Sequence, residues 1–165
     1  MARYCTHENE VEDPRYRAFL GRLCTPLVPL LRAKAQGLDF GCGPGPALAA
    51  MLREAGFGME VYDKYFSPIL PSGKFDFITC TETAEHFRRP RHEFERLNSW
   101  LKPHAWLGLM TEQSPTDETS FAKWYYHKDP THLVFYSPET IQWLCGFFDW
   151  TYQQPRPNVW LLQKR

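Results

Sequence analysis

Three side chains that can bind a metal stand close together in the middle of the chain, Glu82, Glu85 and His86. They directly follow an apolar stretch, 75–81, that is typical of a buried strand. If the chain turns helically there, positions i, i+3 and i+4 lie on one face. Two adjacent carboxylates repel each other unless a cation or a proton lies between them, so without a cation they should diverge. Two oxygens with an imidazole suit Mn²⁺, Mg²⁺ or Fe²⁺, and Zn²⁺ less well, so the spacing indicates a divalent metal site.

A glycine-rich turn, G-C-G-P-G at 41–45, forms a second candidate site between an apolar stretch and a helical pattern. Glycines at such a turn let a ligand approach the backbone and the start of the helix. Pro46 stands where the dinucleotide-binding fingerprint has its third glycine, and it removes an N–H that would face a diphosphate. Asp63 ends the next predicted strand, where a carboxylate can accept hydrogen bonds from ribose hydroxyls. Together these residues predict a ribose-bearing cofactor without a diphosphate.

The elements that position these residues follow from the hydrophobic periodicity. The predicted strands are 37–40, 59–63, 75–81, 106–111, 149–153 and 158–163. Helical patterns separate them, and Asp13-Pro14 and Ser137-Pro138 have the form of helix starts. This alternation predicts an α/β fold, a doubly wound Rossmann-like sheet that is mostly parallel with an antiparallel last strand. We expect a single domain over 1–165, with N-terminal helices in 1–34, including a short second helical piece from Pro26, and the binding core in 35–165.

Composition narrows the class of protein. The 165 residues are 43% hydrophobic and carry 19 basic and 19 acidic side chains, which excludes a disordered chain and disfavours nucleic acid held by bulk charge. The odd number of cysteines, without C-x-x-C spacing, indicates free thiols and a reducing compartment. They are Cys5, Cys24, Cys42, Cys80 and Cys145. The N-terminus lacks the apolar core of a signal peptide and no window is apolar enough to span a membrane, so we expect a cytoplasmic protein.

The segment L-D-F-G-C-G-P-G at 38–45 resembles motif I of the class I S-adenosylmethionine-dependent methyltransferases. Asp63 matches the acidic residue that holds the ribose in that family, and 75–82 and 101–111 resemble its fourth and fifth strand regions. The resemblance covers about 35–165. It implies S-adenosylmethionine as cofactor, with the methionine end near Asp39, Gly41 and Gly43. The full set of cofactor contacts that it implies is Asp39, Gly41, Cys42, Gly43, Asp63, Lys64, Thr81 and Glu82.

Two departures from the family pattern concern the edge of the sheet and one turn. Only residues 64–74 separate Asp63 from the strand at 75–81, too few for the usual helix and third strand. We therefore expect that third strand to be reduced or missing, with the loop 65–68 as a candidate cover for the adenine. The turn before the fifth strand is His104-Ala105 where the family usually has two glycines.

The stretch T-E-T-A-E-H-F at 81–87 resembles the E-x-x-E-H signature of small-RNA 3′-end 2′-O-methyltransferases and of ubiquinone-biosynthesis O-methyltransferases. The small-RNA enzymes add a histidine from beyond the fifth strand, and 129–137 resembles that stretch. The resemblance thus implies four metal ligands: Glu82, Glu85, His86 and His132. The alternative is a metal-free member, in which the Glu-His pair caps a turn and contacts cofactor or substrate.

The predicted function is methyl transfer from S-adenosylmethionine to a small-molecule or end-group acceptor. In the metal version the cation orients and activates an acceptor hydroxyl. In the metal-free N-, S- or O-methyltransferase, His132 or His127 takes the acceptor's proton, so the candidate catalytic residues are His86, His132 and His127. A non-catalytic methyltransferase-like binding domain is the remaining alternative. The basic run 88–92 is either a solvated helix start or an anchor for an acidic substrate.

Overall fold

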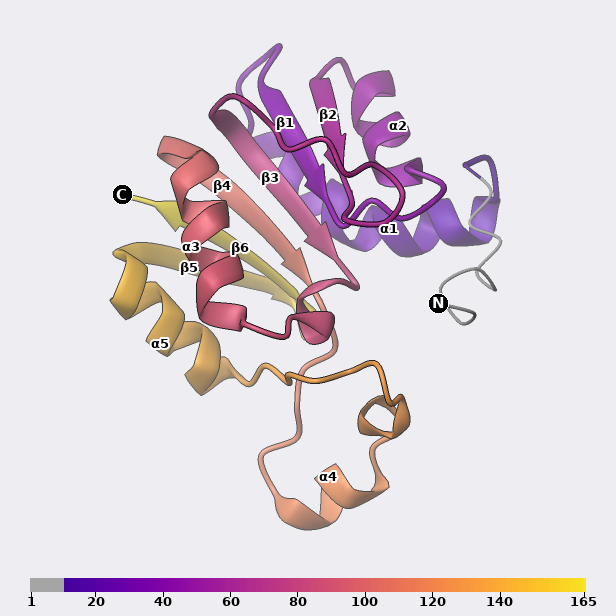
Figure 1. Cartoon of the computed structure of the whole chain (residues 1–165), viewed down its shortest axis with the longest axis vertical. Coiled ribbons are helices and arrows are strands. Elements are labelled where there is room, and N and C mark those ends of the chain that lie inside the picture. Colours follow the sequence, from indigo (N-terminus) through magenta and orange to yellow (C-terminus); the bar gives the residue numbers. More distant parts are fainter. Residues whose placement is uncertain (1–10) are drawn as a thin grey trace.

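Six strands form one sheet in the computed structural model, which describes residues 11–165, and their order is β2-β1-β3-β4-β6-β5 (Figure 1). The strands are β1 (Gln36–Phe40), β2 (Gly58–Tyr62), β3 (Phe75–Thr81), β4 (Leu101–Met110), β5 (Trp150–Arg156) and β6 (Val159–Lys164). The first four in this order run parallel, and β6 is antiparallel to both β4 and β5. The mostly parallel sheet with an antiparallel last strand is confirmed. Cys5 lies outside the described residues.

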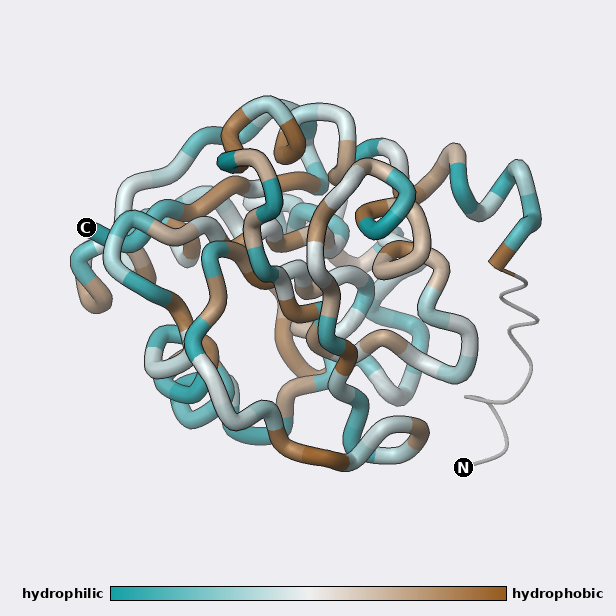
Figure 2. The backbone as a smooth tube through the Cα atoms, turned by 90° about the horizontal axis from the view of Figure 1, so that it is seen from above, coloured by the Kyte–Doolittle hydropathy of each residue, from teal (hydrophilic) through white to brown (hydrophobic). Residues whose placement is uncertain are grey.

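Helices cover both faces of the sheet (Figure 1). One face carries α1 (Pro14–Leu27) and α2 (Ala47–Glu54), and the other carries α3 (Pro90–Trp100) and α5 (Pro138–Phe148). The short α4 (Glu118–Lys123) projects beyond the sheet within the long connection that follows β4. In Figure 2, hydrophobic segments run through the middle of the chain trace, as a sheet buried on both faces requires.

Local capping sets the start of two helices as the sequence predicts. The Asp13 carboxylate accepts from the Arg15 amide at 2.8 Å, and the Ser137 hydroxyl accepts from the Thr140 amide at 3.3 Å. The predicted second helical piece begins after Leu27 rather than at Pro26, and it is a single 3₁₀ turn. Pro26 lies in the last turn of α1, and only a 3₁₀ turn, Val28–Leu30, follows.

The edge of the sheet at β2 lacks a further strand within residues 11–165. The segment 64–74 forms a single isolated bridge, between Asp63 and Ser67, and no helix or strand. The predicted loss of the third strand of the family is thus confirmed. Eleven residues, 64–74, are too few for a crossover helix and a strand, so β2 stays at the edge.

Two strand boundaries differ from the prediction by more than one residue. β4 begins at Leu101, because its start pairs with Phe75 before a register shift in the ladder. β5 continues to Arg156 through Pro155, and its ladder with β6 shifts register between Gln153 and Arg156. Proline has no N–H for a ladder, so it is tolerated at this irregularity of an edge strand.

The topology fixes where a ligand can bind. The chain passes from β1 outward to β2, then returns across β1 to β3 and β4. Parallel sheets bind ligands at the carboxyl ends of the strands on either side of such a switch point. The residues that follow β1, β2 and β3 are therefore the ones expected to form a site.

No helix among the described residues is long and apolar enough to cross a membrane.

Candidate functional site

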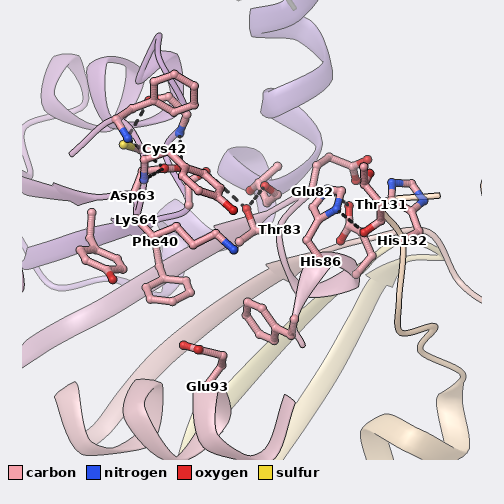
Figure 3. A pocket seen from close by; sticks show the side chains of 18 of the residues that line it. Phe40, Cys42, Asp63, Lys64, Glu82, Thr83, His86, Glu93, Thr131 and His132 are labelled. Carbon is pink, nitrogen blue, oxygen red and sulfur yellow. Dashed lines mark hydrogen bonds and ion pairs between the residues drawn. The ribbon is translucent and has the colours of Figure 1, made fainter. Parts of the chain in front are cut away.

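A cavity of about 870 Å³ opens at the carboxyl ends of β1, β2 and β3. This volume is in the range of small-molecule and cofactor sites. Figure 3 shows its two ends: Cys42, Asp63 and Lys64 lie at one, and His86 and His132 at the other. Helix α1 adds an aromatic wall through Tyr16 and Phe19.

The glycine turn after β1 has the conformation that only glycine adopts without strain. Gly41 and Gly43 have φ of +81° and +63°. A Cβ at Gly41 would lie 2.2 Å from the Thr83 hydroxyl oxygen, so this glycine also permits close approach of the two loops. A Cβ at Gly43 would meet nothing within 4 Å, because its backbone faces open space in the cavity wall. The turn thus exposes backbone to a ligand at Gly43.

Asp63 links the glycine turn to the segment that follows β2. One carboxylate oxygen accepts from the Gly43 amide at 3.2 Å, and the other from the Tyr65 and Phe66 amides at 2.8 and 3.2 Å. Tyr65 and Phe66 also line the cavity. The structure therefore brings the carboxylate predicted to bind ribose, and the loop predicted to cover adenine, to the same end of one cavity.

Asp39 does not line the cavity, in contrast to the position implied by the family resemblance. It is 3% exposed beneath the glycine turn, and its carboxylate accepts from the Thr79 hydroxyl at 2.9 Å. Burial raises its pKa to about 6. Asp39 thus supports the turn from below. The other predicted cofactor contacts line the cavity: Gly41, Cys42, Gly43, Asp63, Lys64, Thr81 and Glu82.

The geometry at Glu82 differs from the predicted helical face. Glu82 has a left-handed φ of +46°, and only Ala84–His86 form a 3₁₀ turn. Its amide donates to the Met110 carbonyl at 2.8 Å, which anchors this strained residue on β4. Burial first, and then the carboxylates of Glu85 and Glu112, raise the pKa of Glu82 well above its ordinary value.

Glu82 and Glu85 both approach the Tyr126 hydroxyl, and the expectation that they diverge when no cation is bound stays a prediction. The Tyr126 hydroxyl donates to Glu85 at 2.6 Å and lies 3.4 Å from a Glu82 oxygen. The other oxygen of the fully buried Glu85 accepts from the Thr111 hydroxyl at 2.8 Å. Hydroxyl donors offset the repulsion of the two carboxylates, a role that the sequence argument gave to a metal or proton.

Glu85, His86 and His132 each offer a ligand atom, and these atoms lie within 4.8 Å of one another. His86 Nε2 is 3.9 Å from a Glu85 oxygen, and the two imidazole centroids are 4.9 Å apart. His132 comes from the connection after β4, where the backbone amides of Leu133 and Val134 donate to the Glu85 carbonyl at 2.7 and 3.1 Å. The structure thus joins three of the four predicted ligands, with Glu82 adjacent through Tyr126.

Two buried polar atoms of the cavity wall have no hydrogen-bond partner within the described residues, Thr81 Oγ1 and Glu82 Oε1. Buried polar atoms are rarely left unpaired unless a ligand, an ion or water completes them. Together with the exposed backbone at Gly43, they fit a polar ligand that extends from the glycine turn toward the histidines.

His127 is not brought to the cavity. Its ring stacks on Phe121 of α4, with 5.0 Å between centroids, and it is absent from the lining. The structure therefore leaves His132 and His86 as the histidines at the site. Thr111 and Tyr126 are the functional positions that sequence reasoning missed. Tyr126 was only one of several aromatics in a long loop, and no spacing rule relates a loop tyrosine to a carboxylate 41 residues earlier.

Comparison with known proteins defines the class. A family model described as "Methyltransferase domain" matches residues 13–154. The chain therefore belongs to this family, and its fold is that of the S-adenosylmethionine-dependent methyltransferases.

Three solved structures illustrate the likeness of the fold. Magnesium protoporphyrin IX methyltransferase from Synechocystis PCC 6803, with bound S-adenosylhomocysteine, has a TM-score of 0.64 and 14% identity over 91% of this chain and 83% of its own. A methyltransferase from Methanosarcina mazei has a TM-score of 0.60 and 15% identity over 84% of this chain and 96% of its own. A third, from Archaeoglobus fulgidus, has a TM-score of 0.59 and 21% identity over 82% of this chain and 69% of its own. By sequence, the chain matches no curated protein.

Proposed function

We propose that this chain transfers the methyl group of S-adenosylmethionine to a hydroxyl of a small-molecule acceptor, with a divalent cation held at the acceptor end. The observation that carries the proposal is the convergence of Glu85, His86 and His132 at the end of the cavity opposite the glycine turn. In the family that this chain belongs to, S-adenosylmethionine supplies an electrophilic methyl group. Catalysis then depends on how the chain aligns the acceptor with that methyl.

The hydrogen bonds of the two histidines support the cation. His86 Nδ1 lies 2.9 Å from the Thr131 carbonyl, and His132 Nδ1 lies 2.8 Å from the Tyr126 carbonyl. A carbonyl only accepts, so both Nδ1 atoms carry the hydrogen and Nε2 is the atom with a lone pair to ligate. Backbone carbonyls orient metal-binding histidines in this way in many proteins.

The donor set favours some cations over others. Two imidazoles and a carboxylate suit Fe²⁺, Mn²⁺ or Zn²⁺, whereas Mg²⁺ prefers oxygen ligands. Glu82, with an unpaired buried oxygen nearby, is the fourth candidate ligand. Such a cation would supply Lewis-acid activation of an acceptor hydroxyl.

At the other end, the chain's own groups fit the cofactor. Asp63 can accept from ribose hydroxyls while it holds the Gly43 amide, and the Gly43 backbone is open to the cavity. Tyr65 and Phe66 can cover a purine ring, because their side chains line the cavity beside Asp63.

One observation favours a second candidate, a metal-free methyltransferase. Both oxygens of Glu85 already accept hydrogen bonds, from Tyr126 and Thr111. His132, with its Nδ1 hydrogen fixed on the Tyr126 carbonyl, would then accept the acceptor's proton at Nε2.

The two candidates are separated by binding and activity measurements on the same protein. Calorimetry should show S-adenosylhomocysteine binding, which Asp63→Asn weakens about tenfold, the scale of a charge-assisted hydrogen bond. Mn²⁺ should bind to the wild type but not to His132→Ala, while both bind S-adenosylhomocysteine equally. Binding of the cofactor product without any binding of Mn²⁺, Fe²⁺ or Zn²⁺ would support the metal-free enzyme. Absence of cofactor binding would contradict both.

A further inference from the structure

Arg88 and Arg89 line the same cavity and follow His86 by two and three residues. Both side chains are exposed, and neither makes an ion pair or hydrogen bond with any residue in 11–165. At no more than about 3.5 Å per residue, their backbone lies within about 7–11 Å of His86. The two arginines thus present positive charge one small molecule away from the candidate metal ligands.

The other arginines of this region are committed to partners. Arg91 pairs with Glu95 at 3.0 Å and lies over the Phe147 ring, outside the cavity. Arg96 pairs with Glu93 at 3.2 Å and lies over the Trp100 ring. Only the two arginines that face the cavity directly before α3 lack such contacts within the described residues.

Arg88 and Arg89 do not serve the stability of α3. Arg89 occupies its N-cap without a side-chain cap bond, and cations at the amino end of a helix are repelled by its dipole. An oxyanion between the two arginines would offset their mutual repulsion and the repulsion from the helix dipole. Arginine presents a fork of N–H donors that matches a carboxylate or phosphate.

We propose that the acceptor carries an anionic group, a carboxylate or a phosphate, which Arg88 and Arg89 hold while its hydroxyl faces His86 and His132. This inference rests on the proposed function and adds the substrate class.

The test compares two probes of equal shape and different charge, 3,4-dihydroxybenzoate and 3,4-dihydroxybenzamide. Titrated into wild-type protein saturated with S-adenosylhomocysteine, the acid should bind at least tenfold more tightly than the amide. The preference should fall below twofold in Arg88→Ala/Arg89→Ala and persist in Arg91→Ala, the matched control. Phenyl phosphate, titrated in the same way, shows whether phosphate or carboxylate is preferred, and tighter binding of either than of the amide supports the proposal.

The inference is overturned if neither the acid nor phenyl phosphate binds the wild type more tightly than the amide, which includes binding of none of the three. A preference that survives in the double variant also overturns it. The affinity for S-adenosylhomocysteine is measured for each variant first. A tenfold loss in Arg88→Ala/Arg89→Ala would assign the arginines to the cofactor and also overturn the inference. If the wild type does not bind S-adenosylhomocysteine, the proposed function fails, and the acid–amide comparison on the cofactor-free protein still decides the role of the arginines.

Discussion

Buried carboxylates dominate this site at the scale of single residues. Asp39 and Glu85 are buried and Glu82 is partly buried, and each has a different set of hydrogen-bond donors. Asp39 accepts from one hydroxyl, Glu85 from two, and Glu82 has one oxygen that is unpaired within the described residues. Burial of a carboxylate with few donors favours its neutral form, so their environments should be visible in the pH dependence of stability.

Asp39→Asn should change the pH dependence of unfolding. Burial raises the folded-state pKa of Asp39 to about 6, above the unfolded value of 3.8. A raised acid pKa destabilises the fold fully above pH 6, and the penalty disappears as pH falls below about 4. The variant should therefore be more stable than the wild type at pH 8, by about 2–3 kcal/mol at most, and similar at pH 4. Urea unfolding at both pH values measures the difference, and a constant difference would contradict the assignment.

Tyr126→Phe should destabilise the protein by removing the hydroxyl that joins the two glutamates. Glu85 then loses a 2.6 Å donor while it stays fully buried, which costs about 1–3 kcal/mol. Tyr125→Phe is the matched control, because Tyr125 is 67% exposed and its loss of hydroxyl should change stability by less than about 0.5 kcal/mol. Urea unfolding in the presence of a chelator compares the two. Equal stability of both variants would show that the contact contributes nothing.

At the scale of elements, the strands and helices that carry the site follow from local patterns. The apolar run at β3 and the caps at Asp13 and Ser137 are local signals, and the structure confirms them. The missing strand after β2 follows from the length of the segment 64–74 alone. The extent of β5 through Pro155 does not, because an edge strand tolerates proline only at a ladder irregularity that the sequence does not show.

In the candidate site, too, some residues could be predicted from the sequence and others could not. Glu85, His86 and Asp63 follow strands, so the topology of parallel sheets predicts that they lie at the same edge of the sheet. His132 was placed by resemblance, and the structure brings it to Glu85 and His86. Tyr126 could not be found, because its contact depends on the path of a long connection rather than on spacing.

The close packing of β1 against its neighbours leads to a prediction about stability. A Cβ at Gly37 would lie 2.3 Å from the Phe77 ring and 2.7 Å from the Met59 sulfur. Gly37→Ala should therefore destabilise the protein by about 1–3 kcal/mol through overpacking. Gly146→Ala, in α5 with nothing within 4 Å of the new Cβ, should be neutral or stabilise by up to about 1 kcal/mol. Thermal unfolding of both variants checks the pair, and a similar shift for both would contradict the packing argument.

The whole molecule consists of a two-faced sheet and a connection, 111–137, that bends away from it and returns (Figure 1). This connection supplies Thr131 and His132 to the cavity wall and the Tyr126 hydroxyl to Glu85. Hydrogen bonds tie it to the rest at Thr111, at Tyr126 and over 131–136, whereas every residue of 115–125 is exposed or partly exposed. Segments with few buried contacts open at low free energy, and ligands that contact them suppress that opening.

Amide hydrogen exchange should report this coupling. With Mn²⁺ and S-adenosylhomocysteine bound, amides in 117–133 should exchange at least about tenfold more slowly, since a ligand at 10–100 times its Kd adds about 1.4–2.7 kcal/mol to opening. The start of β4 at 102–105 is the internal control, because it lies at the amino end of the parallel strands, opposite the cavity, and should not change. His132→Ala should keep slow exchange near Gly41–Gly45 with S-adenosylhomocysteine but lose the effect of Mn²⁺ on 117–133. Protection of 117–133 by Mn²⁺ in that variant would mean that the connection responds to the cation without His132, against the proposed ligand set.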